Sequence, residues 1–246
     1  MIPAEVLAKR GYAGAMRMVR GVAAPLGVLD RPANARRSRY RHWLQSLLAI
    51  YDIDALIRLD VPWWTYDAIE AVEDFLQARK AARVFEYGSG ASTVWLAKRA
   101  REVISVEHDA DWIEFSRPRL AELGNASIAH VPADPQPVSD QRYHSGKAGY
   151  RGQSFKAYVE TIDSHSGAFD LIVVDGRARG ACLMQAVGRL AEEGMIVFDN
   201  SCRARYREAI AASGLEARVT RGLVPSLPIP DETTLLRKRQ QSPKCG

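Results

Sequence analysis

The feature that most constrains this chain is an alternation of short apolar runs with longer amphipathic runs between residues 83 and 213. The apolar runs are rich in Val, Ile and Phe, as buried parallel strands are, and the intervening runs have helical spacing. This pattern predicts strands at 83–87, 102–107, 126–131, 168–175 and 194–199, with helices at 92–99, 109–123, 155–162, 181–193 and 205–213. Pro118 is expected to kink or end the second of these helices.

Two further strands, at 215–220 and 232–238, are joined by a loop with no helical pattern and are expected to form an antiparallel pair. The whole order predicts an α/β fold with a mostly parallel seven-stranded sheet and helices on both faces. A chain of 246 residues, 47% of them apolar, can bury one such core. Ligands of such sheets bind at the carboxyl ends of the strands, which is where the polar motifs of this chain fall.

The first 60 residues differ from the rest and are expected to form a basic, partly helical extension, with the main domain at 61–246. Residues 1–41 hold nine Lys and Arg against Glu5 and Asp30, which leaves a net charge of −2 for the remainder. A nucleic-acid groove in the body is therefore not expected. The basic arm is read either as a solvated extension or as a peripheral contact with an anionic membrane surface. Residues 42–59 have helical spacing and are expected to brace the body, and Thr65 is placed to cap the next helix, at about 66–80.

The three cysteines, Cys182, Cys202 and Cys245, match neither a disulfide framework nor a CxxC metal site. They predict reduced thiols in a cytoplasmic protein. No apolar stretch approaches the roughly 18 residues of a membrane span. A secretory signal is disfavoured because Pro25 interrupts the only early apolar run.

The glycine turn after the first strand, Gly88-Ser89-Gly90, opens a helix and offers free backbone N–H groups to a ligand. Glu107 ends the next strand 19 residues after Gly88, where a carboxylate can accept both hydroxyls of a ribose. Thr93 stands where a dinucleotide fingerprint has Gly or Ala. Glu86, two residues before the first glycine, suits a cationic ligand better than a pyrophosphate.

The chain resembles the class I S-adenosylmethionine-dependent methyltransferases, which have a Rossmann-like fold. The motifs that carry the resemblance are residues 84–90, 103–108, 169–176 and 194–199, and it covers about residues 62–240. It implies that residues 88–90 wrap the methionine part of the cofactor, Glu86 lies near its ammonium and Glu107 holds its ribose. His108 would flank the adenine and Asp134 would reach the adenine amine. The full set of cofactor-binding residues expected is Glu86, Tyr87, Gly88, Ser89, Gly90, Ser92, Glu107, His108, Asp134 and Asp175.

Asp175 ends the fourth strand, and Asp199 and Asn200 end the fifth. These positions resemble the cation-dependent O-methyltransferases, in which such residues bind Mg²⁺ or a similar divalent cation, and oxygen ligands suit that ion. That subgroup has a lysine where this chain has Ala178. In the alternative interpretation, Asp175 and Asp199 orient substrate and cap helices without a metal.

The predicted reaction is methyl transfer to a small-molecule acceptor, with oxygen as the favoured nucleophile. His144, Asp175 or the metal could deprotonate a hydroxyl acceptor. His144 belongs to a long polar segment, 132–154, that could close over the site together with Tyr143, Lys147 and Tyr150. Four arginines follow the fourth and fifth strands and either receive an anionic group of the substrate or are solvated: Arg177, Arg179, Arg203 and Arg205. Trp63 and Trp64 pack in the core or wall the cavity.

Two other functions remain open from the residues alone. One is an NAD(P)-dependent oxidoreductase on the same general fold. The other is a non-catalytic binding protein that engages membrane or nucleic acid through the basic arm. Cofactor affinity separates the first from a methyltransferase, and salt-dependent binding lost with residues 1–41 would identify the second.

Overall fold

The computed structural model describes residues 4–23, 34–50, 52–147 and 149–239. Parts of the predicted basic arm, at 1–3 and 24–33, and Cys245 lie outside the described residues. Cys182 and Cys202 are free thiols, and the predicted cytoplasmic location stays a prediction.

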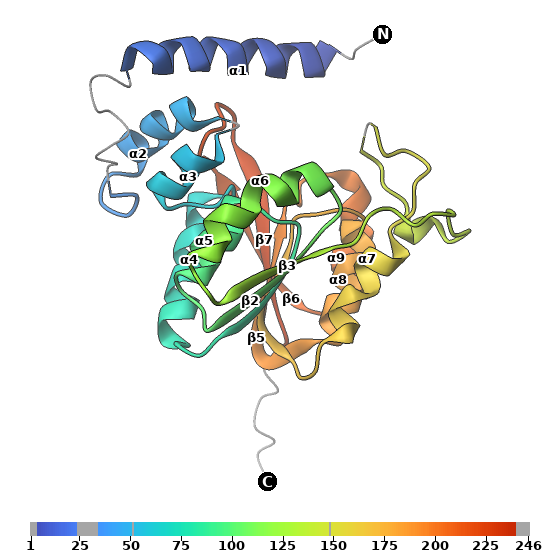
Figure 1. The fold of residues 1–246 in the computed structure, drawn as a ribbon. Helices are drawn as coiled ribbons and strands as arrows, with labels where there is room; N and C mark the ends of the chain where they lie inside the picture. Colours follow the sequence, from blue (N-terminus) through green and yellow to red (C-terminus); the bar gives the residue numbers. More distant parts are fainter. Residues whose placement is uncertain (1–3, 24–33, 51, 148, 240–246) are drawn as a thin grey trace.

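The centre of the molecule is a seven-stranded sheet with the order β3-β2-β1-β4-β5-β7-β6 (Figure 1). Its strands are β1 (Arg83–Tyr87), β2 (Glu102–Glu107), β3 (Ala126–His130), β4 (Phe169–Val174), β5 (Leu190–Asp199), β6 (Glu216–Gly222) and β7 (Asp231–Arg237). Strands β1 to β5 pair in parallel, and β7 is antiparallel to both β5 and β6. The predicted mostly parallel sheet with a closing antiparallel pair is confirmed.

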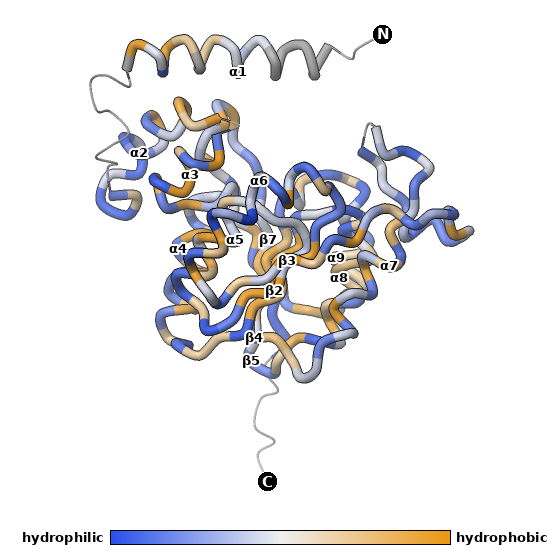
Figure 2. Tube along the Cα trace, viewed as in Figure 1, coloured by the Kyte–Doolittle hydropathy of each residue, from blue (hydrophilic) through white to orange (hydrophobic). Residues whose placement is uncertain are grey.

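The sheet is buried on both faces because its central strands alternate apolar side chains above and below. Helices α4 (Tyr66–Ala78) and α5 (Ala91–Ala97) pack into the core on one face, with Val84, Val103 and Leu171. Helices α7 (Lys156–Glu160) and α8 (Arg179–Val187) pack on the other face, with Phe85, Ile172 and Phe198. Figure 2 shows the hydrophobic colour concentrated on the central strands. The sequence prediction of helices on both faces is correct.

The remaining helices are α6 (Ala110–Ala121), which contacts β3, and α9 (Arg207–Ala212), which packs on α8. Pro118 lies inside α6, so the helix does not end at the proline, and a kink there stays a prediction. A proline at 118 removes the partner of the carbonyl of Glu114, but Glu114 is exposed and water can satisfy that carbonyl.

The helix predicted at 181–193 is also too long, since α8 ends at Val187 and β5 begins at Leu190. Leu190 lies beside Phe169 in the parallel ladder with β4. Glu192 and Glu193 lie in the irregular stretch between the pairs Phe169–Leu190 and Leu171–Met195, so they belong to the strand despite their helical preference.

Before the sheet, the chain forms α1 (Ala4–Ala23), α2 (Arg39–Ser46), a short 3-10 turn (Leu47–Ala49) and α3 (Ile53–Leu59). Trp43 Nε1 donates to the Leu227 carbonyl at 2.9 Å and α3 contacts α5, so residues 42–59 pack on the body as predicted. Just before them, Arg39 binds Asp67 at 2.7 Å and Glu70 at 2.8 Å on α4. Thr65 accepts a hydrogen bond from the backbone of Ala68 and caps α4, also as predicted. The domain boundary at 60 and 61 stays a prediction.

Helix α1 lies apart from the sheet in Figure 1, with Met18 and Val22 exposed. Within the described residues, no helix has both the length and the hydropathy of a membrane span. A peripheral membrane contact through residues 1–41 stays a prediction.

Candidate functional site

A cavity of about 1830 Å³ lies at the carboxyl ends of β1, β2, β4 and β5. Its floor is formed by the turns that follow these strands, at Gly88, His108, Gly176 and Asn200. Residues 141–147 and 150–152 of the long polar segment form another part of its wall, as do Trp63 and apolar residues of the extension. The cavity is therefore where the sheet topology predicts a ligand site.

The glycine turn is held in a shape that only glycine adopts readily. Gly88 has φ of +103°, and a side chain there would come within 3.3 Å of the backbone of Asp175. The backbone N–H of Ser89 donates to Glu107 Oε2 at 3.1 Å, and Trp112 Nε1 donates to the Ser89 carbonyl at 2.7 Å. The tips of β1 and β2 therefore lie side by side, as the predicted cofactor site requires. Trp112 was not anticipated from sequence because only its place in the first turn of α6 brings it to this loop.

Glu107 is buried, and its carboxylate is surrounded by donors. Oε1 accepts from the backbone N–H of His108 at 2.7 Å and of Asp109 at 3.1 Å, and lies 2.5 Å from His108 Nδ1. Burial alone would raise the pKa of Glu107, but these hydrogen bonds outweigh it and hold the pKa below its ordinary value. The ionised form of Glu107 is thus favoured, and this carboxylate lines the cavity at the end of β2.

His108 connects this carboxylate to the far side of the cavity. Arg177 Nε donates to His108 Nε2 at 3.1 Å. Because an arginine cannot accept a hydrogen bond, Nε2 must be the nitrogen without a proton, and Nδ1 carries the proton that faces Glu107. His108 lines the cavity, and its predicted role beside the adenine stays a prediction.

Glu86 is 1% exposed and lines the inner end of the cavity. Its carboxyl group accepts from Ser92 at 2.5 Å, Thr93 at 2.6 Å and Ser105 at 2.7 Å, all through neutral hydroxyls. Burial raises the pKa of Glu86 to about 7, although the three hydroxyls oppose the shift. A carboxyl group held in this way gains from a nearby cation of the ligand.

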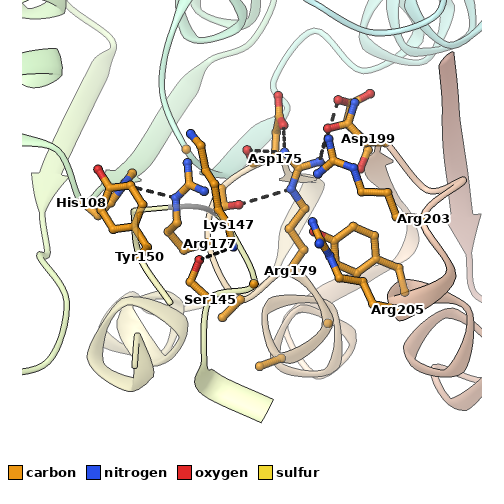
Figure 3. Close-up of a pocket in the computed structure, with 18 of the residues that line it drawn as sticks. His108, Ser145, Lys147, Tyr150, Asp175, Arg177, Arg179, Asp199, Arg203 and Arg205 are labelled. Atoms are coloured by element: carbon orange, nitrogen blue, oxygen red, sulfur yellow. Dashed lines mark hydrogen bonds and ion pairs between the residues drawn. The ribbon is translucent and has the colours of Figure 1, made fainter. Parts of the chain in front are cut away.

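Asp175, Asp199 and Asn200 do come together, but around Arg179, which Figure 3 shows with Asp175 and Asp199. Arg179 donates to Asn200 Oδ1 at 3.0 Å and to the Asp199 carbonyl at 2.6 Å, and forms a close ion pair with Asp175 Oδ1. Its guanidinium also lies 3.9 Å from Asp199 Oδ2. A guanidinium thus lies where the predicted metal ion would be, so these residues do not fit a divalent cation. Nor do three His, Cys, Asp or Glu side chains form a metal cluster elsewhere in the described chain.

The second carboxyl of this group is deeply buried. Asp199 is 3% exposed and accepts from Thr233 Oγ1 at 2.9 Å. Burial, and then the neighbouring Asp175, raise the pKa of Asp199 to about 8, against the opposing effect of Arg179. Burial thus disfavours the ionised form of Asp199 that a metal ion needs, and its oxygens face Arg179.

Three sequence-predicted residues lie away from the cavity lining. Tyr87 is fully buried and its hydroxyl donates to the Val159 carbonyl at 2.8 Å. Asp134 accepts from the backbone N–H groups of Lys156 and Ala157, at 2.7 and 3.1 Å, and so caps α7 where an adenine contact was expected. Trp64 packs in the core.

The other predicted residues, including His144, Ser92 and the four arginines, line the cavity. The geometry thus brings together the glycine turn, Glu86, Glu107, His108 and Asp175, and leaves out the side chains of Tyr87 and Asp134.

The order of the strands, with an antiparallel β7 between β5 and β6, identifies the fold. The chain has the class I methyltransferase fold. Its structure aligns with cofactor-bound Rv0187 from MTB at a TM-score of 0.52 and 20% identity, covering 78% of this chain and 90% of that one. It is also similar to a precorrin-6y C5,15-methyltransferase from Geobacter metallireducens, with a TM-score of 0.49, 14% identity and coverage of 72% and 91%.

An rRNA methylase from Streptococcus thermophilus gives a TM-score of 0.48 at 15% identity, covering 70% of this chain and 96% of that one. No model of a known protein family matches the sequence, and no curated protein matches it. Of these three matches, only cofactor-bound Rv0187 has a TM-score above 0.5, and at 20% identity it shows a shared fold alone, so the activity has to be argued from the site.

Proposed function

We propose that this chain is an S-adenosylmethionine-dependent methyltransferase that acts on a small-molecule acceptor, with oxygen as the nucleophile. One observation carries the proposal. The bare peptide turn at 88–90 is held 3.1 Å from Glu107 by the Ser89 N–H, at the rim of a cavity that also reaches the buried Glu86.

The charges of the groups beside the glycine turn are complementary to those of S-adenosylmethionine. Glu86 and Glu107 are two carboxyl groups in the part of the cavity beside the glycine turn. The cofactor has an ammonium, a sulfonium and a ribose, for which these groups and the free N–H groups of the turn are suitable partners. When bound, it supplies an already activated methyl group, so alignment and exclusion of water can account for much of the rate.

The dinucleotide alternative is less compatible with the chain. The dinucleotide fold has a sixth parallel strand, whereas β7 here is antiparallel and lies between β5 and β6. Glu86, behind the glycine turn, would repel a pyrophosphate. The methyltransferase proposal accounts for both features.

A hydroxyl acceptor must lose its proton, and His144 is the stronger candidate for the base. His144 lines the cavity, and its Nε2 lies 2.7 Å from the Val138 carbonyl. That carbonyl can only accept, so Nε2 carries a proton and Nδ1 is the basic nitrogen that would receive the acceptor's proton. Asp175, the other candidate, is engaged by Arg179 and better suited to orient groups than to take a proton.

Titration calorimetry with S-adenosylmethionine, S-adenosylhomocysteine and NAD tests the proposal. We expect both adenosyl ligands to bind and NAD not to bind. The Glu107→Ala variant should bind them roughly 100-fold more weakly, because it loses charge-assisted hydrogen bonds to the ribose. Glu102→Ala, at the other end of β2 and paired with Arg83, is the matched control and should bind normally. NAD binding by the wild type, or adenosyl binding unaffected by Glu107→Ala, would contradict the assignment.

A further inference from the structure

Charge is divided unevenly along the lining of the cavity. The lining residues between 86 and 112 include three carboxylates and no Lys or Arg. The described lining residues between 141 and 212 include three carboxylates and seven cationic side chains, which are Arg142, Lys147, Arg151, Arg177, Arg179, Arg203 and Arg205. The cavity therefore has an acidic part beside the glycine turn and a strongly basic part beside the ends of β4 and β5.

Most of these cations lack an acidic partner. Arg142 pairs with Asp140 at 2.6 Å, and Arg179 pairs with Asp175. Among the described residues, no carboxylate lies within 4.0 Å of the side-chain nitrogens of Lys147, Arg177, Arg203 or Arg205. The carboxyl groups of Asp175 and Asp199 are already occupied by Arg179. The basic part thus has positive charge that the protein itself does not neutralise.

Aromatic rings hold two of the unpaired arginines in place. The Arg177 guanidinium lies 5.1 Å from the ring centre of Tyr150, and its Nε is fixed by His108. The Arg205 guanidinium lies 4.8 Å from the ring centre of Tyr206 and donates to its hydroxyl at 3.2 Å. Although Arg205 is exposed, contact with an aromatic ring restricts a guanidinium group before a ligand arrives.

The cations are close enough to oppose one another. Partial burial, and then repulsion by Arg177 and Arg179, lower the pKa of Lys147. Arg203 lies near enough to Asp175 to favour its ionised form, and Figure 3 shows Arg203 and Arg205 beside Arg179. A bound anion would relieve this repulsion.

We propose that the acceptor is a small molecule with a carboxylate or phosphate group, and that Lys147, Arg203 and Arg205 hold this group. The inference rests on the proposed methyltransferase function and names its substrate class. A nucleic acid is the less suitable anion, because residues 42–246, which contain the cavity lining, carry a net charge of −2. The compact basic part of the cavity suits a single anionic group.

The test is calorimetry on the complex with S-adenosylhomocysteine, using phenyl phosphate, benzoate and the neutral benzamide as probes. The phosphate and carboxylate probes distinguish the two possible anions. We expect at least one of them to bind about tenfold or more tightly than benzamide. The double variant Arg203→Ala/Arg205→Ala should lose that preference while keeping its affinity for S-adenosylhomocysteine, which shows that it is folded. Arg207→Ala, an exposed arginine next to this pair and outside the lining, is the matched control.

Equal binding of the three probes, or an anion preference that survives in the double variant, would overturn the proposal. Salt-sensitive binding of a single-stranded oligonucleotide that is tighter than that of either anion would overturn it in favour of a nucleic-acid acceptor. Failure of S-adenosylhomocysteine to bind the wild type would instead contradict the proposed function. The anion preference can then still be measured on the protein alone.

Discussion

Residues 86–112 and residues 141–212 line one cavity, but they neutralise buried charge in different ways. In the first region, Glu86 and Glu107 are satisfied by hydroxyls and peptide N–H groups, and no cationic side chain reaches the lining. In the second region, Asp175 and Asp199 share the guanidinium of Arg179, and additional cations surround the group.

The difference indicates what each region can bind. Neutral donors leave a carboxylate free to attract a positively charged ligand, whereas a full ion pair does not. Excess cations attract a negatively charged ligand. The first region of the cavity is therefore suited to a cationic cofactor, and the second region is suited to an anionic acceptor.

The largest effect is expected from removing the cation of the second region. Arg179→Met leaves Asp175 and Asp199 close together without a guanidinium, and should lower the free energy of unfolding by about 3 kcal/mol or more. Urea denaturation measures this. Arg36→Met, which breaks the half-exposed pair with Asp74, should cost about 0.5 kcal/mol. Equal losses in the two variants would mean that the buried group is not held together by its charge.

A smaller effect is expected where the two regions touch, at the approach of Gly88 to the backbone of Asp175. Gly88→Ala places a side chain at φ of +103°, 3.3 Å from that backbone. It should cost about 2 kcal/mol of stability and weaken binding of S-adenosylhomocysteine, measured by denaturation and calorimetry. Gly124→Ala has a similar positive φ in open space, so it should lose stability by strain alone and bind normally. Weakened binding in both variants would show that strain, and not crowding at the strand tips, is the cause.

The charge of the first region should give cofactor binding a pH dependence. The pKa of Glu86 is raised to about 7, so its carboxyl group gains a proton as the pH falls through that value and its attraction for the cofactor's ammonium is lost. We expect the affinity for S-adenosylhomocysteine to fall about tenfold from pH ~8 to pH ~6. Glu86→Gln should be weak and independent of pH over this range. A wild-type affinity that is flat across the range would remove Glu86 from the cofactor site.

The smallest effect is expected from metal ions. Because Arg179 occupies the space between Asp175 and Asn200, neither Mg²⁺ nor a chelator should change the Tm or the affinity for S-adenosylhomocysteine. Thermal denaturation with each addition checks this. A rise in Tm with Mg²⁺ that disappears in Asp175→Asn would restore the metal interpretation.

Sequence reasoning succeeded where strand order alone determines position. Glu107 and the turn at 88–90 end neighbouring parallel strands, so their proximity follows from the order of the elements. It failed where the direction of one side chain decides the outcome. Asp134 lies just after β3, but the chain returns to it at Ser154, and Asp134 caps α7.

The sequence did contain an indication that Arg179 lies beside Asp175, although the metal prediction did not use it. An arginine four residues after Asp175, in the first turn of a helix, can reach back to that carboxylate. Ala178, the residue before Arg179, adopts a left-handed conformation with φ of +43°. No pattern in the sequence predicts this conformation. The metal prediction considered the oxygen atoms of Asp175, Asp199 and Asn200, but it did not consider the guanidinium of Arg179 that lies beside them.

The polar segment at 132–154 lines the basic part of the cavity, and hydrogen bonds join its beginning to its end. The Asp134 N–H donates to the Ser154 carbonyl at 2.9 Å, and the Ser154 hydroxyl binds Asp134 and accepts from the Val138 N–H at 3.1 Å. Since these contacts hold the ends of the intervening stretch together, the entropic penalty of lengthening or shortening it is small. Exchanging that stretch is thus expected to reshape this wall of the cavity while the glycine turn and Glu107, on other strands, keep their contacts.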